Sequence, residues 1–103
     1  MTDFYDGPGK FEWNLGKAKR NAGKHRVTFE EAVTVFRDPF SLTLPDPEHS
    51  DIEERLLLVG LSDRRRLIVV SYVERGEILR IISARTADAD ERRDYEEEPD
   101  YGN

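Results

Sequence analysis

Three apolar segments separated only by short turns place the strongest constraint on the fold of this chain. They span residues 55–61, 66–73 and 77–84, and leucine, isoleucine and valine dominate all three. Each segment has the length of a strand and is shorter than an average helix. Arg75 and Gly76 suit a two-residue hairpin turn, because glycine accepts a positive φ. The sequence therefore predicts a buried antiparallel meander, with residues 62–65 as its other turn.

Two helices are predicted ahead of this meander. Asn14 is a candidate N-cap for a helix that ends near residues 23–24. Thr28 and Glu31 have the spacing of a capping box, and apolar residues follow at helical intervals. The Asp38–Pro39 pair ends this second helix, because the residue before a proline avoids helical backbone angles.

The remaining segments complete an α+β domain. Residues 11–13 and 42–44 alternate between apolar and polar side chains, as short strands do. Thr86 is expected to open a C-terminal helix. Residues 1–9 and 97–103 are expected to fray, and no linker divides the chain. We predict one domain over residues 1–103, with two N-terminal helices packed on a four- to five-stranded, mainly antiparallel sheet.

Charge is distributed unevenly along the chain. The net charge of −6 comes entirely from residues 86–103, which carry eight acids against two arginines, whereas residues 1–85 are neutral. Basic residues bunch in three clusters, Lys17, Lys19, Arg20, Lys24 and Arg26, then Arg64, Arg65 and Arg66, then Arg75, Arg80 and Arg85. Each cluster is either a solvated surface or a basic face for an anionic partner.

Composition excludes several classes of protein. The chain contains no cysteine, which rules out disulfides, thiol nucleophiles and cysteine-ligated metals. Its apolar runs are far shorter than the ~20 residues of a membrane-spanning helix. Residues 1–10 are polar and have no signal-peptide character, so a cytoplasmic location is expected. His25 and His49 are the only imidazoles and match no metal-site spacing, and no phosphate-binding loop is present. We expect no metal and no cofactor.

Lys24, His25 and Arg26 place three potential cations in one short connection between the predicted helices. Such a group is stabilised by a bound anion at the helix terminus. The alternative is that His25 only complements the dipole at the helix C-terminus.

Arg80 lies within an apolar strand, where an unpaired charge is costly. It should either reach the open face of the sheet or pair with an acid such as Glu54 or Glu91. Strand alternation places Arg80 and Arg85 on opposite faces, so they converge only if the strand twists or bulges.

These motifs, in this order and spacing, resemble the BrnT toxins of type II toxin–antitoxin modules. The resemblance runs from about Phe11 to Glu96 and rests on Phe11-Glu12-Trp13, Lys24-His25, residues 27–32, Asp38-Pro39, Glu54-Arg55, Gly60, residues 80–85, Glu91-Arg92 and Tyr95-Glu96. It implies a RelE-like fold and a ribosome-independent endoribonuclease. It also implies neutralisation by a BrnA-like ribbon-helix-helix antitoxin, in a 2:2 complex that contacts operator DNA only through the antitoxin.

The resemblance and the chemistry of RNA cleavage together suggest site residues. Metal-independent attack by a 2′-hydroxyl needs a base, an acid and cations around the phosphate. The expected catalytic residues are Lys24, His25, Glu54, Arg80, Arg85 and Tyr95. The expected RNA-binding residues are Lys24, Arg26, Arg80, Arg85 and Arg92. A catalytically inactive module that binds a DNA-binding antitoxin is the competing interpretation, because the neutral body lacks the basic excess of most nucleases.

One position departs from the family pattern. Arg26 stands where these toxins usually have glycine after the Lys-His pair. If that position requires a positive φ, arginine is strained there. Otherwise the turn is built differently, with Gly23 as its glycine.

Overall fold

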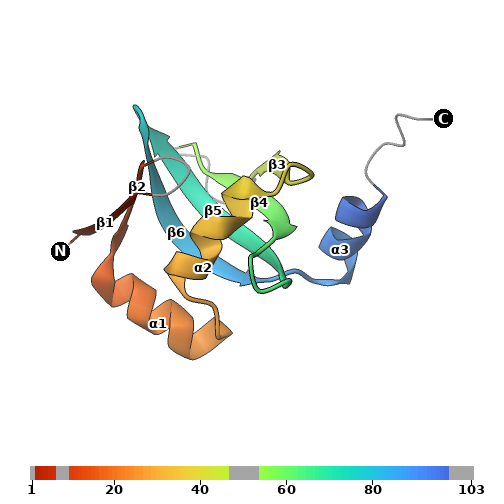
Figure 1. The fold of residues 1–103 in the computed structure, drawn as a ribbon, viewed down its shortest axis with the longest axis horizontal. Helices are drawn as coiled ribbons and strands as arrows, with labels where there is room; N and C mark the ends of the chain where they lie inside the picture. The colour runs from red at the N-terminus through yellow and green to blue at the C-terminus, as the bar shows by residue number, and fades with distance from the viewer. Residues whose placement is uncertain (1, 7–9, 47–53, 98–103) are drawn as a thin grey trace.

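The structure is a computed structural model that describes residues 2–6, 10–46 and 54–97. Its elements follow the order β1 (Thr2–Asp6), β2 (Lys10–Asn14), α1 (Leu15–His25), α2 (Phe29–Thr34), the 3-10 helix η1 (Val35–Arg37), β3 (Leu42–Pro45), β4 (Leu56–Leu61), β5 (Leu67–Arg75), β6 (Ile78–Thr86) and α3 (Ala89–Glu96). Figure 1 shows α1 and α2 beside one face of a twisted sheet, with α3 at the opposite end of the molecule. The predicted α+β class and the meander are confirmed.

The sheet is larger and more mixed than predicted. It has six strands in the order β1-β2-β6-β5-β4-β3, and β2 runs parallel to β6 while the other neighbours are antiparallel. Thr2–Asp6 pairs with β2 as an edge strand, where fraying was expected. The helices follow the first two strands and are therefore not the N-terminal elements. They connect β2 to β3, which lies at the far edge of the sheet. β2 instead pairs with β6, a strand far along the chain, so no hairpin sets the direction of this pairing.

The main core lies between the sheet and the helices α1 and α2. Its buried residues share one face of the strands and the inner side of the helices. They are Phe11, Trp13, Val27, Phe29, Ala32, Val33, Val35, Leu58, Ile68, Val70, Tyr72, Ile81 and Ala84. Trp13 packs edge-on against Phe29 with ring centroids 5.8 Å apart. Because these contacts join α2 to β2, they hold both elements on the sheet.

A bulge in β6 changes which side chains share a face. Ser71 pairs with Ser83 and Tyr72 pairs with Ile81, so Ile82 is an extra residue without a partner on β5. The residues opposite Val69, Ser71 and Val73, which alternate on one face of β5, are Arg85, Ser83 and Arg80. The bulge therefore brings Arg80 and Arg85 to the same face, which strict alternation had separated.

Helix and turn boundaries follow local signals, with some shifts. The side chain of Asn14 accepts the amide of Lys17 at 3.0 Å and caps α1, which continues to His25. The hairpin loop is Gly76–Glu77 and not Arg75–Gly76, because Arg75 already pairs with Ile78. Gly76 has a φ of 63°, a value that favours glycine.

The start of α3 also differs from the prediction. Thr86 is the last residue of β6, and Asp88 caps α3 in a complete capping box with Glu91. The expected box at Thr28 is only half formed. Thr28 accepts the amide of Glu31 at 3.0 Å, but the Glu31 carboxylate binds Ser62 and Arg66 instead.

α3 covers part of the sheet face opposite α1 and α2. Ala87 and Tyr95 pack against a second apolar cluster formed by Val59, Leu67 and Val69. In the part of the chain that the structure describes, no helix has the length and apolar character needed to cross a membrane.

Candidate functional site

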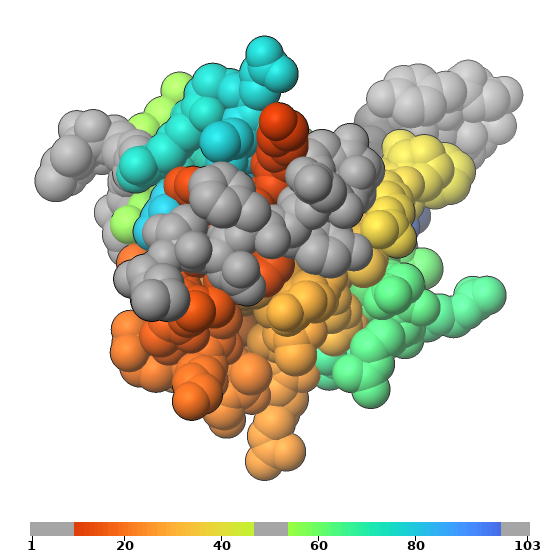
Figure 2. All heavy atoms as spheres, turned by 60° about the vertical axis from the view of Figure 1, so that its left-hand side comes forward, coloured from red at the N-terminus to blue at the C-terminus, as the bar shows by residue number. Residues whose placement is uncertain are grey.

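A basic groove lies where α1 meets the bulge of β6. It encloses about 270 Å³ and is lined by Lys17, Arg20, Asn21, Lys24, His25 and Ile82. The α1 residues recur at helical spacing and so share one face. Figure 2 shows α1, in orange, projecting from the surface beside the lighter α2. Lys24 and His25 were expected site residues. Lys17 and Arg20 were noted only as part of a basic cluster.

Asn21 forms the floor of the groove and fixes α1 to β6. Its amide nitrogen donates to the carbonyls of Val27 at 2.9 Å and Ala84 at 2.8 Å, and its side-chain oxygen accepts the Ala84 amide at 3.0 Å. The residue is only 7% exposed. Because these bonds occupy the side-chain amide of Asn21, its role is structural. It holds the cations of α1 beside Ile82.

The groove carries positive charge without acidic compensation. Helix α1 contains no aspartate or glutamate, and its last turn is basic. Within the described residues, no carboxylate pairs with Lys17, Arg20, Lys24 or His25. Such a surface attracts an anion.

Arg26 ends α1 in the left-handed conformation, with φ 59° and ψ 31°. Its amide donates to the carbonyl of Ala22 at 3.0 Å, and its own carbonyl accepts from Arg66 at 2.8 Å. Of the two alternatives for this turn, the structure therefore has the one with positive φ at Arg26. Lys24 and His25 keep their place in the last turn of α1, and the arginine carries the backbone strain.

We expect Arg26→Gly to raise the free energy of unfolding by about 1 kcal/mol, because glycine adopts this conformation without the penalty of a Cβ. Urea denaturation measures the change. Arg26→Ala is the matched control, since it removes the same charge but keeps the Cβ. Equal stabilisation by both substitutions would show that charge, not backbone strain, limits stability here.

Arg80 and Arg85, on the other face of the sheet, both have carboxylate partners. Arg80 donates to Glu12 on β2 at 2.8 Å, and these side chains are 21% and 13% exposed. Arg85 makes a two-pronged contact with Glu91, with both distances 2.8 Å. Hydrogen bonding from Arg85 is the main reason that the pKa of Glu91 is lowered. Exposed Arg92 lies 3.8 Å from Glu96.

Removing Arg80 should destabilise the fold. We expect Arg80→Ala to cost about 2 to 3 kcal/mol, somewhat less than a fully buried pair, because Glu12 remains as a partly buried charge. Thermal unfolding of Arg80→Ala and of the double variant Glu12→Gln with Arg80→Ala measures this. The double variant should recover part of the loss. A fully stable Arg80→Ala protein would show that the pair adds nothing and that Arg80 is free for another role.

Tyr95 ties α3 to the end of η1. Its hydroxyl donates to the Asp38 carboxylate at 2.6 Å. Burial, together with this bond to a carboxylate, raises the pKa of Tyr95 to about 12. Burial alone would raise the pKa of Asp38, but hydrogen bonds from Tyr95 and the amides of Leu61 and Phe40 lower it. The hydroxyl of Tyr95 is thus engaged in docking α3.

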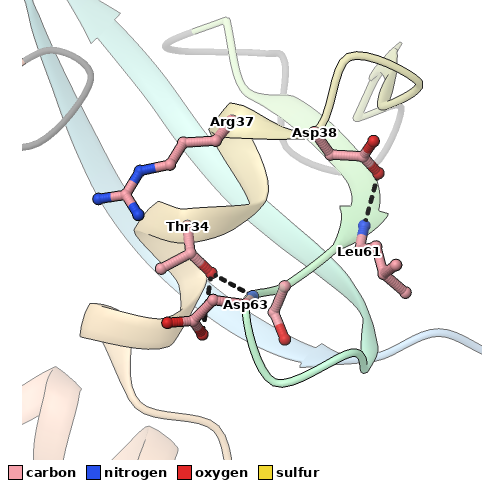
Figure 3. Close-up of a pocket in the computed structure, with 6 residues that line it drawn as sticks. Thr34, Arg37, Asp38, Leu61 and Asp63 are labelled. Carbon is pink, nitrogen blue, oxygen red and sulfur yellow. Dashed lines mark hydrogen bonds between the residues drawn. The ribbon is translucent and has the colours of Figure 1, made fainter.

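A second hollow of about 260 Å³ adjoins this contact. It is lined by Thr34, Arg37, Asp38, Leu61, Ser62 and Asp63. Figure 3 shows Asp38 bound to the Leu61 amide and Thr34 bound to Asp63. These bonds connect α2 and η1 to the end of β4 and the turn after it, so Thr34, Asp38 and Asp63 have structural roles in this hollow.

One other expected catalytic residue lies outside the groove. Glu54 is exposed just before β4 and does not line the groove. His49 lies outside the described residues. In the described ranges 2–6, 10–46 and 54–97, no three His, Asp or Glu side chains gather as a metal site would require.

The fold and the groove together define a small α+β protein with a basic groove beside α1. A family model described as the ribonuclease toxin BrnT of type II toxin–antitoxin systems matches residues 13–91, and the chain belongs to this family. Its structure is similar to the crystal structure of the Brucella abortus ribonuclease toxin BrnT. The two share 24% identity and a TM-score of 0.58, over 74% of this chain and 92% of the other. No curated protein sequence matches significantly.

Proposed function

We propose that this chain is a metal-independent endoribonuclease toxin that cleaves RNA at the α1 groove. The observation that carries the proposal is the group of cations in this groove, which has no carboxylate partner among the described residues and includes an imidazole. The family assignment supports RNA as the polyanion. The groove thus combines phosphate-binding groups with a side chain suited to proton transfer near neutral pH.

Cleavage would proceed by attack of the ribose 2′-oxygen on the adjacent phosphorus. His25 accepts the 2′-hydroxyl proton, a new P–O bond forms, and the bond to the 5′-oxygen breaks. The protonated imidazole or water then supplies the proton for the departing 5′-oxygen. Lys24 and Arg26 balance the charge that develops on the phosphate oxygens. The products are a 2′,3′-cyclic phosphate and a free 5′-hydroxyl.

The arginines of β6 fit a supporting role better than a direct one. To bind phosphate, Arg80 would have to leave Glu12, and Arg85 would have to leave Glu91. We therefore assign both arginines to holding β2 and α3 against β6. Tyr95 shares this role through Asp38. Glu54 remains an alternative proton acceptor, and Arg92 remains an alternative contact for RNA at the rim.

The family also implies partners. A type II toxin is neutralised by an antitoxin protein, and we propose a BrnA-like ribbon-helix-helix antitoxin in a 2:2 complex. Operator DNA would then be contacted through the antitoxin alone. We also propose a cytoplasmic location, where the chain would meet cellular RNA and a DNA-binding antitoxin.

Purified protein should degrade RNA equally well with and without a chelator. The reason is that protein cations, not a metal ion, stabilise the transition state in this proposal. Gel analysis of a defined RNA measures the rate, and rising salt should slow it because the contacts are to phosphates. Activity that disappears in chelator and returns with a divalent ion would contradict metal independence.

The competing function is an inactive antitoxin-binding module, which the neutral charge of residues 1–85 favours. Expression of the chain alone in a bacterium separates the two functions. Growth arrest that a co-expressed antitoxin relieves supports the toxin. Unaffected growth, together with intact RNA in the purified assay, supports the module.

A further inference from the structure

We propose that Lys17, Arg20 and Ile82 form a subsite that binds the backbone of single-stranded RNA beside Lys24 and His25. This inference rests on the proposed function and extends it to residues that take no part in the chemical step. Lys17 and Arg20 are positioning residues here, because they lie along α1 from the imidazole and line the same groove.

The spacing of the cations fits a nucleic-acid strand. Lys17, Arg20 and Lys24 lie three and four positions apart on α1. At ~1.5 Å per residue, this row is about 10 Å long. A helical strand advances ~3.4 Å per nucleotide, so the row can contact more than one phosphate. A strand held by Lys17 and Arg20 would continue toward Lys24 and His25, at the opposite end of the row.

Ile82 gives the groove an apolar wall. As the extra residue of the β6 bulge, it leaves the alternation of the strand and lines the groove with the cations of α1. An apolar wall opposite a row of cations suits a nucleotide, whose base is largely apolar on its faces while its phosphate is charged. The volume of about 270 Å³ lies just below the ~300 Å³ lower end of small-molecule pockets. The groove is therefore on the scale of a single unstacked nucleotide.

Helix α1 also provides a matched control. Lys19 is exposed and carries the same charge as Lys17 on the same helix, but it does not line the groove. General attraction to a polyanion would depend equally on Lys17 and Lys19. A built subsite would depend on Lys17 and Arg20 alone.

The test measures binding separately from cleavage. A fluorescent single-stranded DNA oligonucleotide serves as the probe, because without a 2′-hydroxyl it cannot undergo the proposed reaction. We expect Lys17→Gln and Arg20→Gln each to weaken binding roughly three- to tenfold at low salt and to reduce the salt dependence by about 0.7 in the log–log slope. Lys19→Gln should change neither value by more than a small fraction. The melting temperatures of all three variants should match that of the natural chain.

Three outcomes would overturn the subsite. One is an equal loss in Lys19→Gln, which would indicate general electrostatics. Another is equally tight binding of a duplex oligonucleotide with the same dependence on Arg20. The last is binding of polyglutamate but not of the oligonucleotide, which would mark the groove as a site for an acidic protein segment. If binding follows the expected pattern but RNA remains uncut, the subsite stands and the proposed enzymatic function fails.

Discussion

Replacement of His25 by glutamine should lower the rate of RNA cleavage by about 10²- to 10⁴-fold, the usual contribution of a general acid–base group. Glutamine keeps a polar side chain of similar size but cannot exchange a proton near neutral pH. His25 is only partly buried at the end of α1, and no carboxylate in the described part of the chain depends on it. The fold should therefore be unaffected. Single-turnover cleavage of a short RNA, together with a melting curve, measures both quantities.

His49→Gln is the control, because His49 is the other histidine of the chain and has no part in the proposal. It should cleave at the natural rate. Lys24→Gln should also reduce cleavage, and this loss should diminish at high salt as phosphate contacts are screened. Full cleavage by His25→Gln, with loss of cleavage in a stable Arg85→Ala protein, would move the reaction to the other face of the sheet.

Local signals in the sequence predicted the elements whose partners lie nearby in the chain. The apolar runs of β4, β5 and β6 are joined by short turns, so their hairpin pairing follows from order alone. The caps at Asn14 and Thr28 are equally local, since each side chain binds an amide three positions away. These features needed no knowledge of the tertiary structure.

Long-range pairing could not be predicted in the same way. β2 joins β6 across more than half of the chain, and Phe11 and Trp13 of β2 pack in the core shared with β6. The bulge at Ile82 has no distinctive residue, because isoleucine suits a regular strand equally well. Regular alternation therefore predicted Arg80 and Arg85 on opposite faces of the sheet. The observed β5–β6 register places both on the same face.

The candidate site also combines residues that local sequence signals identify with residues that only long-range contacts bring together. Lys24 and His25 could be identified from the sequence because three basic residues adjoin a helix end. The partners of the arginines could not, since Glu12 and Arg80 are 68 positions apart and meet only through the pairing of β2 with β6. The sequence placed Lys17 and Arg20 in a basic cluster and left open whether it is a solvated surface or a face for an anionic partner. Their place in a groove depends on Asn21, which anchors α1 to Ala84.

The largest stability effect is expected at Glu31, and Glu31→Ala should lower the free energy of unfolding by about 3 to 5 kcal/mol. The Glu31 side chain is only 3% exposed and forms an ion pair with Arg66. It also accepts the hydroxyl of Ser62 at 2.7 Å. Its removal leaves the Arg66 guanidinium without its carboxylate and releases the turn after β4 from α2. Chemical denaturation measures the loss. Glu30→Ala, at an exposed neighbouring position of α2, should change stability by less than about 0.5 kcal/mol.

The contribution of Glu31 should also depend on pH in a defined direction. Burial alone would raise the pKa of Glu31, but hydrogen bonds from Arg66 and Ser62 and the charges of Arg66 and Arg64 outweigh it, so the pKa lies below its usual value of 4.5. A carboxyl whose pKa is lower in the folded state stabilises the protein fully above its unfolded pKa, and this stabilisation is lost as the pH falls through the folded value. The natural chain should therefore exceed Glu31→Gln in stability by a constant amount near neutral pH. This difference should shrink below pH 4.5, where the natural side chain also becomes neutral. A difference that stays constant into strong acid would mean that the shape of the side chain, and not its charge, supports the turn.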